Sequence, residues 1–247
     1  MGSLLTELCA AWCEWELGAI VTVRLANELS ASELSFLGVG IRRVTQTQHH
    51  VVFVYEAPDG SLRLSHLEWH RRFRGDAPWD GQYYWCTAAG MDELNRKTIA
   101  AWLHALARKP QSMDYGLSFD DCEFIADGDG TYAFVAKTPG KGVTCATFVM
   151  LVLQTVGFPL LDAETWQTRP EDVQWQESII QTLRQHSGMT EQEADLVAQD
   201  VGSARFRPIE VATAAQHDPW PVNFHTATAL AADVMADVAN LRLQNAA

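Results

Sequence analysis

Residues 50–73, HVVFVYEAPDGSLRLSHLEWHRRF, decide how this chain of 247 residues folds. They begin with a β-branched and aromatic run, His50–Glu56, which is typical of a buried strand. The next four residues, APDG at 57–60, have proline and glycine at the positions that a β-turn favours. Residues 61–73 then predict a returning strand. The whole stretch therefore predicts an antiparallel hairpin.

The length of the turn determines which side chains of this hairpin are neighbours. If residues 58–60 form a three-residue loop, His50 lies opposite Glu68 and diagonal to His66, and all three share one face. His49 then lies on the other face, among apolar neighbours. A shift of one residue in the pairing would exchange the faces and favour His49 instead. The pattern predicts a polar cluster centred on His50, with His49 as the alternative.

Cys145 is the candidate nucleophile. It stands between a loop rich in Gly and Pro, residues 138–142, and an apolar run, residues 146–153, that predicts a helix. The N–H groups and the positive end of a helix favour an anion, so this position predicts a lowered thiol pKa. The other four cysteines show no metal-type pairing, and the odd count of five indicates free thiols (Cys9, Cys13, Cys86 and Cys122). The alternative is that Cys145 is simply a small buried residue.

Two motifs carry a resemblance to a known family. The hairpin His50-Val-Val-Phe-Val-Tyr and Gly60-Ser-Leu-Arg-Leu-Ser-His66 resembles the H-V-x-I-Y and G-x-x-I-H hairpin of NlpC-type papain-like amidases. The stretch Thr144-Cys145-Ala-Thr-Phe-Val is similar to N-C-E-H-F-V in the circularly permuted branch, which includes the lecithin:retinol acyltransferase-like proteins. In that branch the histidine precedes the cysteine, as it does here. The resemblance covers roughly residues 18–158.

The resemblance implies a role for each matching residue. Cys145 would be the nucleophile, His50 the base, and His66 the group that orients His50, with Glu68 as its substitute. Thr144 stands where the branch has Asn, which leaves the backbone N–H of Cys145 as the oxyanion donor. The implied activity is hydrolysis of a peptide or isopeptide amide through an acyl-enzyme, without a cofactor or metal.

Three other functions fit parts of the same pattern. An acyltransferase would use the same Cys and His pair and pass the acyl group to an amine or hydroxyl. A non-catalytic binding module would carry the hairpin histidines for structural reasons alone. A metal site could be built from the histidines of the hairpin, although these have no Cys partner (His49, His50, His66 and His70).

The predicted fold class is α+β. An antiparallel sheet packed on the helix of Cys145 would form a permuted papain-like core over residues 1–158, with an N-terminal helix at about 3–17 and a strand at 19–25. Residues 159–247 show helical patterns and no strong strand, which predicts a helical extension packed on that core (about 170–186, 190–201 and 225–244).

The composition excludes some partners. The formal net charge of −13 disfavours nucleic acid and anionic membranes, and weakly favours a neutral or cationic peptide or amide substrate. No apolar run approaches the roughly 20 residues of a membrane span. The first residues lack the basic segment of a signal peptide, which predicts a cytoplasmic protein as synthesised. As a bacterial effector or toxin it would be exported without a cleavable signal and have an inhibitor or immunity protein as partner.

Overall fold

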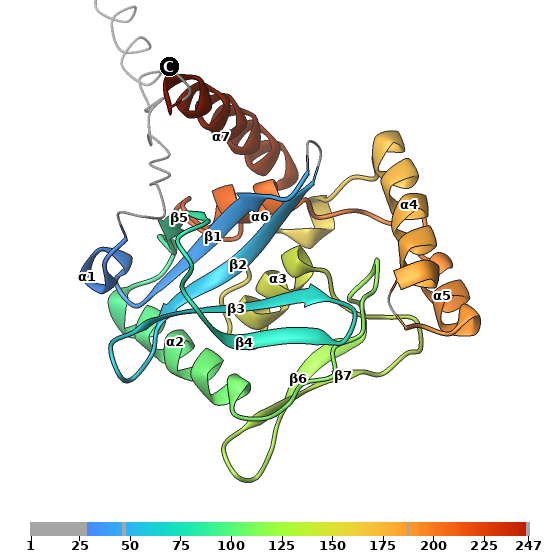
Figure 1. Ribbon diagram of the computed structural model, residues 1–247, viewed down its shortest axis with the longest axis horizontal. Coiled ribbons are helices and arrows are strands. Elements are labelled where there is room, and N and C mark those ends of the chain that lie inside the picture. The colour runs from blue at the N-terminus through green and yellow to red at the C-terminus, as the bar shows by residue number, and fades with distance from the viewer. Residues whose placement is uncertain (1–28, 46–47, 187, 246–247) are drawn as a thin grey trace, which may run out of the picture.

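The computed structural model describes residues 29–45, 48–186 and 188–245, so the expected helix at 3–17 and strand at 19–25 lie outside it. Five antiparallel strands form one sheet in the order β4-β3-β2-β1-β5. Figure 1 shows this sheet with α2 and α3 beside it. The strand bounds are Leu37–Arg43 (β1), His49–Glu56 (β2), Leu62–Trp69 (β3), Arg72–Pro78 (β4) and Tyr84–Thr87 (β5).

The hairpin turn has the predicted length. The N–H of Ala57 donates to the carbonyl of Ser61 over 2.9 Å, which closes a three-residue loop. Gly60 has a φ of 78°, a conformation that glycine adopts without steric cost. The strand register follows from the loop: Phe53 pairs with Ser65 and Glu56 with Leu62.

The prediction of one returning strand over residues 61–73 is wrong. β3 ends at Trp69, and the chain reverses before β4 begins at Arg72. Arg71 has a φ of 55°, and its N–H donates to the carbonyl of Met113 over 2.8 Å. A left-handed residue at this point turns the chain back, and β4 becomes the edge of the sheet beside β3.

The helix of Cys145, α3, spans Cys145–Thr155 and packs against β2 and β3. Phe148 is fully buried, and its ring lies 6.1 Å from that of Phe53 on β2. The remaining elements before α3 are a short helix, the helix that Asp92 caps, and a separate hairpin (α1 Ala31–Leu34, α2 Glu93–Ala107, β6 Cys122–Ala126 and β7 Tyr132–Ala136). The described residues therefore form an α+β fold in which a helix bearing the candidate nucleophile packs on an antiparallel sheet.

The part of the chain after residue 158 is helical, as predicted, and shares the hydrophobic core of the sheet. Its helices are α4 Pro170–His186, α5 Glu191–Ala198, α6 Pro208–Ala214 and α7 Phe224–Asn245, with a 3₁₀ turn at Ala163–Thr165. The sequence patterns did not predict α6, which packs on β1, β2 and α3. Within the described ranges, no helix is both long and apolar enough to cross a membrane.

Candidate active site

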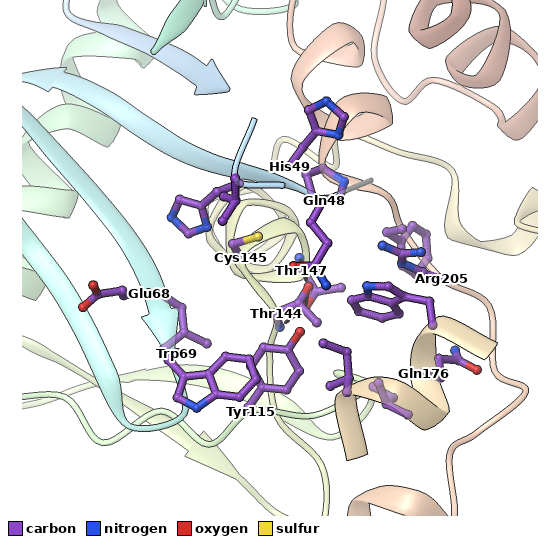
Figure 2. A pocket seen from close by; sticks show the side chains of 18 residues that line it. Gln48, His49, Glu68, Trp69, Tyr115, Thr144, Cys145, Thr147, Gln176 and Arg205 are labelled. Atoms are coloured by element: carbon purple, nitrogen blue, oxygen red, sulfur yellow. Dashed lines mark hydrogen bonds between the residues drawn. The ribbon is translucent and has the colours of Figure 1, made fainter. Parts of the chain in front are cut away.

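A pocket of about 200 Å³ opens at the N-terminal end of α3. Its lining comes from two parts of the chain, as Figure 2 shows. One wall consists of β2, β3 and the start of α3, with His50, Glu68 and Cys145 among its residues. The other wall consists of α4 and the segment before α6, with Trp175 and Arg205 among its residues. Residues of the predicted extension thus form one wall of the site.

His50 and His66 form a direct pair, as the register of the hairpin predicts. His50 Nε2 lies 2.8 Å from His66 Nδ1, and the two rings meet edge to face with centroids 4.8 Å apart. Both side chains are buried. Because this contact uses Nε2 of His50, its Nδ1 remains the ring nitrogen for a second partner.

The sulfur of Cys145 lies against the backbone of β2 beside His50. The recorded pairing of β2 with β3 stops at Phe53 and Ser65. Just beyond this point, the backbone N–H of Val51 favours the Cys145 thiolate by hydrogen bonding. His50 shares its strand face with Val52, opposite to the face on which Phe53 meets α3. Both His50 and Cys145 line the pocket, which lies at the end of the β2–β3 pairing.

The pKa of the Cys145 thiol is raised, although its helix position predicted the opposite. Burial is the largest cause, and it outweighs the N–H groups of Val51 and Ala146 and the charge of Arg205, all of which lower the pKa. Burial also lowers the pKa of His50 to about 3 and that of His66 to about 4. The resting site therefore holds a neutral thiol beside neutral imidazoles.

The residues predicted to support this pair have different surroundings. Thr144 caps α3: its hydroxyl accepts from the N–H of Thr147, and its own N–H donates to the hydroxyl of Thr147 over 2.7 Å. Glu68 lines the pocket, but its carboxylate accepts from Arg74 Nε over 3.2 Å and points away from Cys145 in Figure 2. His49 also lines the pocket, and Figure 2 shows its ring directed away from Cys145.

Tyr115 belongs to the site but was not predicted from the sequence. Figure 2 shows its hydroxyl directed toward Thr144. Tyr115 reaches this position because the loop before it runs against the loop before Cys145, where the N–H of Val143 donates to the carbonyl of Asp114 over 2.9 Å. A side chain at Gly142 would place its Cβ only 2.3 Å from that carbonyl oxygen, so the close approach requires glycine. The Gly-rich loop was visible in the sequence, but its partner was not.

The second wall carries buried charges that the sequence analysis also missed. The carboxylate of Asp172 accepts from Arg169 Nε, Arg205 Nη1 and Arg207 Nε over 2.7, 3.0 and 3.1 Å. Glu210, which lies on α6, forms an ion pair with Arg169. We call these five residues the arginine cluster. Asp172 and Glu210 are each only 2% exposed, which places this ionic network inside the protein.

The alternative of a metal site on the hairpin finds no support. Among the residues that the structure describes, no group of three or more His, Cys, Asp or Glu side chains is arranged to hold a metal ion. His50 and His66 bind each other, and His70 Nδ1 accepts from the backbone N–H of Tyr115 over 3.2 Å.

No protein-family model, curated protein or solved structure matches this chain. What the site can do is therefore inferred from its own residues. The thiol of Cys145 at a helix N-terminus and the imidazole of His50 on β2 line one partly enclosed pocket, and His66 on β3 contacts His50 from outside this lining. These are the groups that nucleophilic catalysis by cysteine requires.

Proposed function

We propose that this protein is a thiol hydrolase that cleaves an amide bond, peptide or isopeptide, through an acyl-enzyme on Cys145. One observation carries the proposal: His50, whose ring contacts His66, lines the same pocket as Cys145. A base that is itself held by a third polar group is the arrangement that activates a nucleophile. The order of histidine before cysteine, and the packing of α3 on an antiparallel sheet, support a permuted papain-like core of the NlpC type.

The mechanism follows from the neutral resting state. Cys145 Sγ attacks the carbonyl carbon while its proton passes to Nδ1 of His50. His66 accepts the Nε2–H of His50 and so fixes the ring that receives this proton. The same proton then goes to the departing amine, which leaves a thioester on Cys145. Water gives a proton to His50 and attacks the thioester, which releases the acid and restores the thiol.

Two groups at the start of α3 are available to stabilise the oxyanion. The backbone N–H of Cys145 lies at the first position of α3, where it has no partner within the helix. The hydroxyl oxygen of Thr144 accepts from the N–H of Thr147 in the cap, which leaves the hydroxyl hydrogen as a second donor. Burial makes each remaining donor more effective than it would be in water.

Selective alkylation tests the proposal before any substrate is known. We expect iodoacetamide at pH 7.5 to modify Cys145 faster than the buried Cys86 and the partly buried Cys122, whose pKa values burial raises to about 12. Peptide mapping by mass spectrometry assigns each site, in a background with Cys9 and Cys13 replaced by Ser. Cys145→Ala should abolish turnover of a peptide and isopeptide library without changing the unfolding curve. Equal labelling of the three cysteines, or turnover by Cys145→Ala, would rule the proposal out.

A further inference from the structure

Arg205 is a fixed positive charge in the wall that faces Cys145. Its guanidinium carbon lies 3.4 Å from the centroid of the Trp175 ring, and its Nη1 donates to Asp172 over 3.0 Å. The side chain is 16% exposed and lines the pocket. Stacking on one face and an ion pair at one nitrogen leave little freedom, so the guanidinium is held in place before anything binds.

Part of this guanidinium remains available to a ligand. The recorded hydrogen bonds of the Arg205 side chain within the described residues use Nη1 alone, which leaves the N–H groups of Nε and Nη2. Asp172 also pairs with the two other arginines of the arginine cluster. Its single negative charge therefore does not fully neutralise Arg205. Two N–H groups on one edge of a guanidinium match the two oxygens of a carboxylate.

The charge of Arg205 also acts on the reacting end of the pocket. Burial raises the pKa of both Cys145 and Tyr115, and the charge of Arg205 acts against this rise in each case, as expected of a guanidinium within electrostatic range of both groups. Among the described residues that line the pocket, Glu68 is the one charged side chain besides Arg205 that carries a carboxylate or a guanidinium. The carboxylate of Glu68 is paired with Arg74 and directed away from Cys145. Arg205 thus brings a positive charge to the lining of this pocket, although the whole chain carries a net charge of −13.

We propose that Arg205 is the specificity-determining residue of the pocket and that the substrate carries a carboxylate close to the scissile amide. Such a group occurs on an acidic residue or at a free carboxyl terminus beside the bond that is cut. This inference rests on the proposed function, because it takes Cys145 as the nucleophile. It reverses the expectation of a neutral or cationic substrate drawn from net charge, since a guanidinium lines the pocket of a chain that is acidic as a whole.

Matched alkylating reagents test the charge preference without a known substrate. Iodoacetate and iodoacetamide differ only in a carboxylate, and N-iodoacetylglycine and its amide place the same difference farther from the sulfur. For each pair, the anionic-to-neutral rate ratio at Cys145 is divided by the ratio for free N-acetylcysteine. We expect at least one pair to give a normalised ratio of about 10 to 100, as a charged hydrogen bond predicts. Arg205→Gln should bring that ratio close to 1.

The ratio separates Arg205 from general effects on the thiol. A change in the nucleophilicity of Cys145 alters both rates of a pair equally and cancels. Arg207→Gln is the matched control, because Arg207 binds the same Asp172 but does not line the pocket. This variant should keep the wild-type ratio. Arg205→Lys should keep part of the preference, since it retains charge but loses the paired N–H groups.

Each outcome bears on one of the two proposals. Cys145 labelled selectively, with normalised ratios near 1 for both pairs, would overturn the role of Arg205 and leave the hydrolase intact. Cys145 inert to all four reagents would overturn both. If Arg205→Gln does not fold, a competition experiment on the wild-type protein tests the same inference. Glutarate should slow the labelling of Cys145 by iodoacetamide, and the neutral diamide glutaramide should not. Equal protection by the two compounds would contradict the inference.

Discussion

The wall of the pocket formed by β2, β3 and α3 carries the groups that we propose to react as neutral, desolvated side chains, whereas the wall formed by α4 and the segment before α6 carries ions. His50 and His66 have pKa values lowered by burial, and Cys145 has one that is raised. Across the pocket, Asp172 and Glu210 are just as buried but remain paired with arginines. One wall therefore suits proton transfer, and the other suits recognition of charge.

This difference has a physical reason. An imidazole or a thiol can lose its charge when it is buried, because its pKa lies within a few units of neutrality. A guanidinium cannot, so it must be paired wherever it is buried. A protein that needs a positive charge in an enclosed pocket therefore has to bury compensating carboxylates behind it, as the arginine cluster does.

The largest effect should follow from removing the base on the neutral wall. We expect His50→Gln to lower turnover by about 10² to 10⁴, the usual contribution of a general base. His49→Gln is the matched control, since His49 is the neighbouring histidine on the same strand and its ring is directed away from Cys145. Steady-state kinetics on one amide substrate compare the two. A greater loss in His49→Gln than in His50→Gln would assign the base to His49.

The next largest effect should come from the charged wall. Asp172→Asn leaves the charges of Arg169, Arg205 and Arg207 poorly compensated, and we expect it to lower the free energy of unfolding by about 3 to 5 kcal/mol. Asp195→Asn removes the exposed partner of Arg184 and should lower the free energy of unfolding by about 1 kcal/mol or less. Urea unfolding at pH 7 measures both. Equal costs would mean that the arginine cluster does not hold this wall in place.

The pH dependence of stability should separate the two walls further. Unfolded histidine binds protons below its ordinary pKa of about 6.5, while folded His66 and His50 stay neutral down to about 4 and 3. Stability should therefore fall as the pH drops from 6.5 toward 4, by up to about 1.4 kcal/mol per pH unit for each histidine.

Urea unfolding between pH 4 and 7 checks this slope. The double variant His50→Gln, His66→Gln should show a shallower fall than the wild type. His225→Gln, at an exposed position on α7, is the control and should leave the slope unchanged. An unaltered slope in the double variant would contradict the burial of two neutral imidazoles.

Much of the neutral wall could be predicted from the sequence because its signals are local. The turn of the hairpin fixes the register from Phe53 to Glu56, and the alternation of side chains along the strands puts His50 and His66 on one face. The loop rich in Gly and Pro, followed by an apolar run, placed Cys145 at the start of a helix. Even here, the predicted shift in the pKa of the Cys145 thiol had the wrong sign. The burial that raises this pKa depends on what packs over the sulfur and not on the helix that carries it.

The charged wall could not be predicted, because its contacts join distant residues. Arg205 meets Asp172 across 33 positions of the chain and reaches the pocket of Cys145 only through tertiary packing. α6 has seven residues and begins at Pro208, which is too short for a periodic pattern to stand out. The end of β3 depends on a left-handed residue, Arg71, whose type gives no local signal for such a conformation.

The smallest effect compares the helix cap beside Cys145 with the cap of α5, which does not line the pocket. Thr144 caps α3 and Thr190 caps α5, each through a reciprocal capping box. We expect Thr144→Ala and Thr190→Ala to cost a similar free energy of unfolding, about 1 kcal/mol, because each leaves a backbone N–H without its acceptor. Only Thr144→Ala should also slow alkylation of Cys145, by about fivefold, since the cap sets the first turn that carries the sulfur. Alkylation rates at equal fractions folded distinguish the two variants. A matching loss in Thr190→Ala would mean that Cys145 responds to stability in general and not to the geometry of its own helix end.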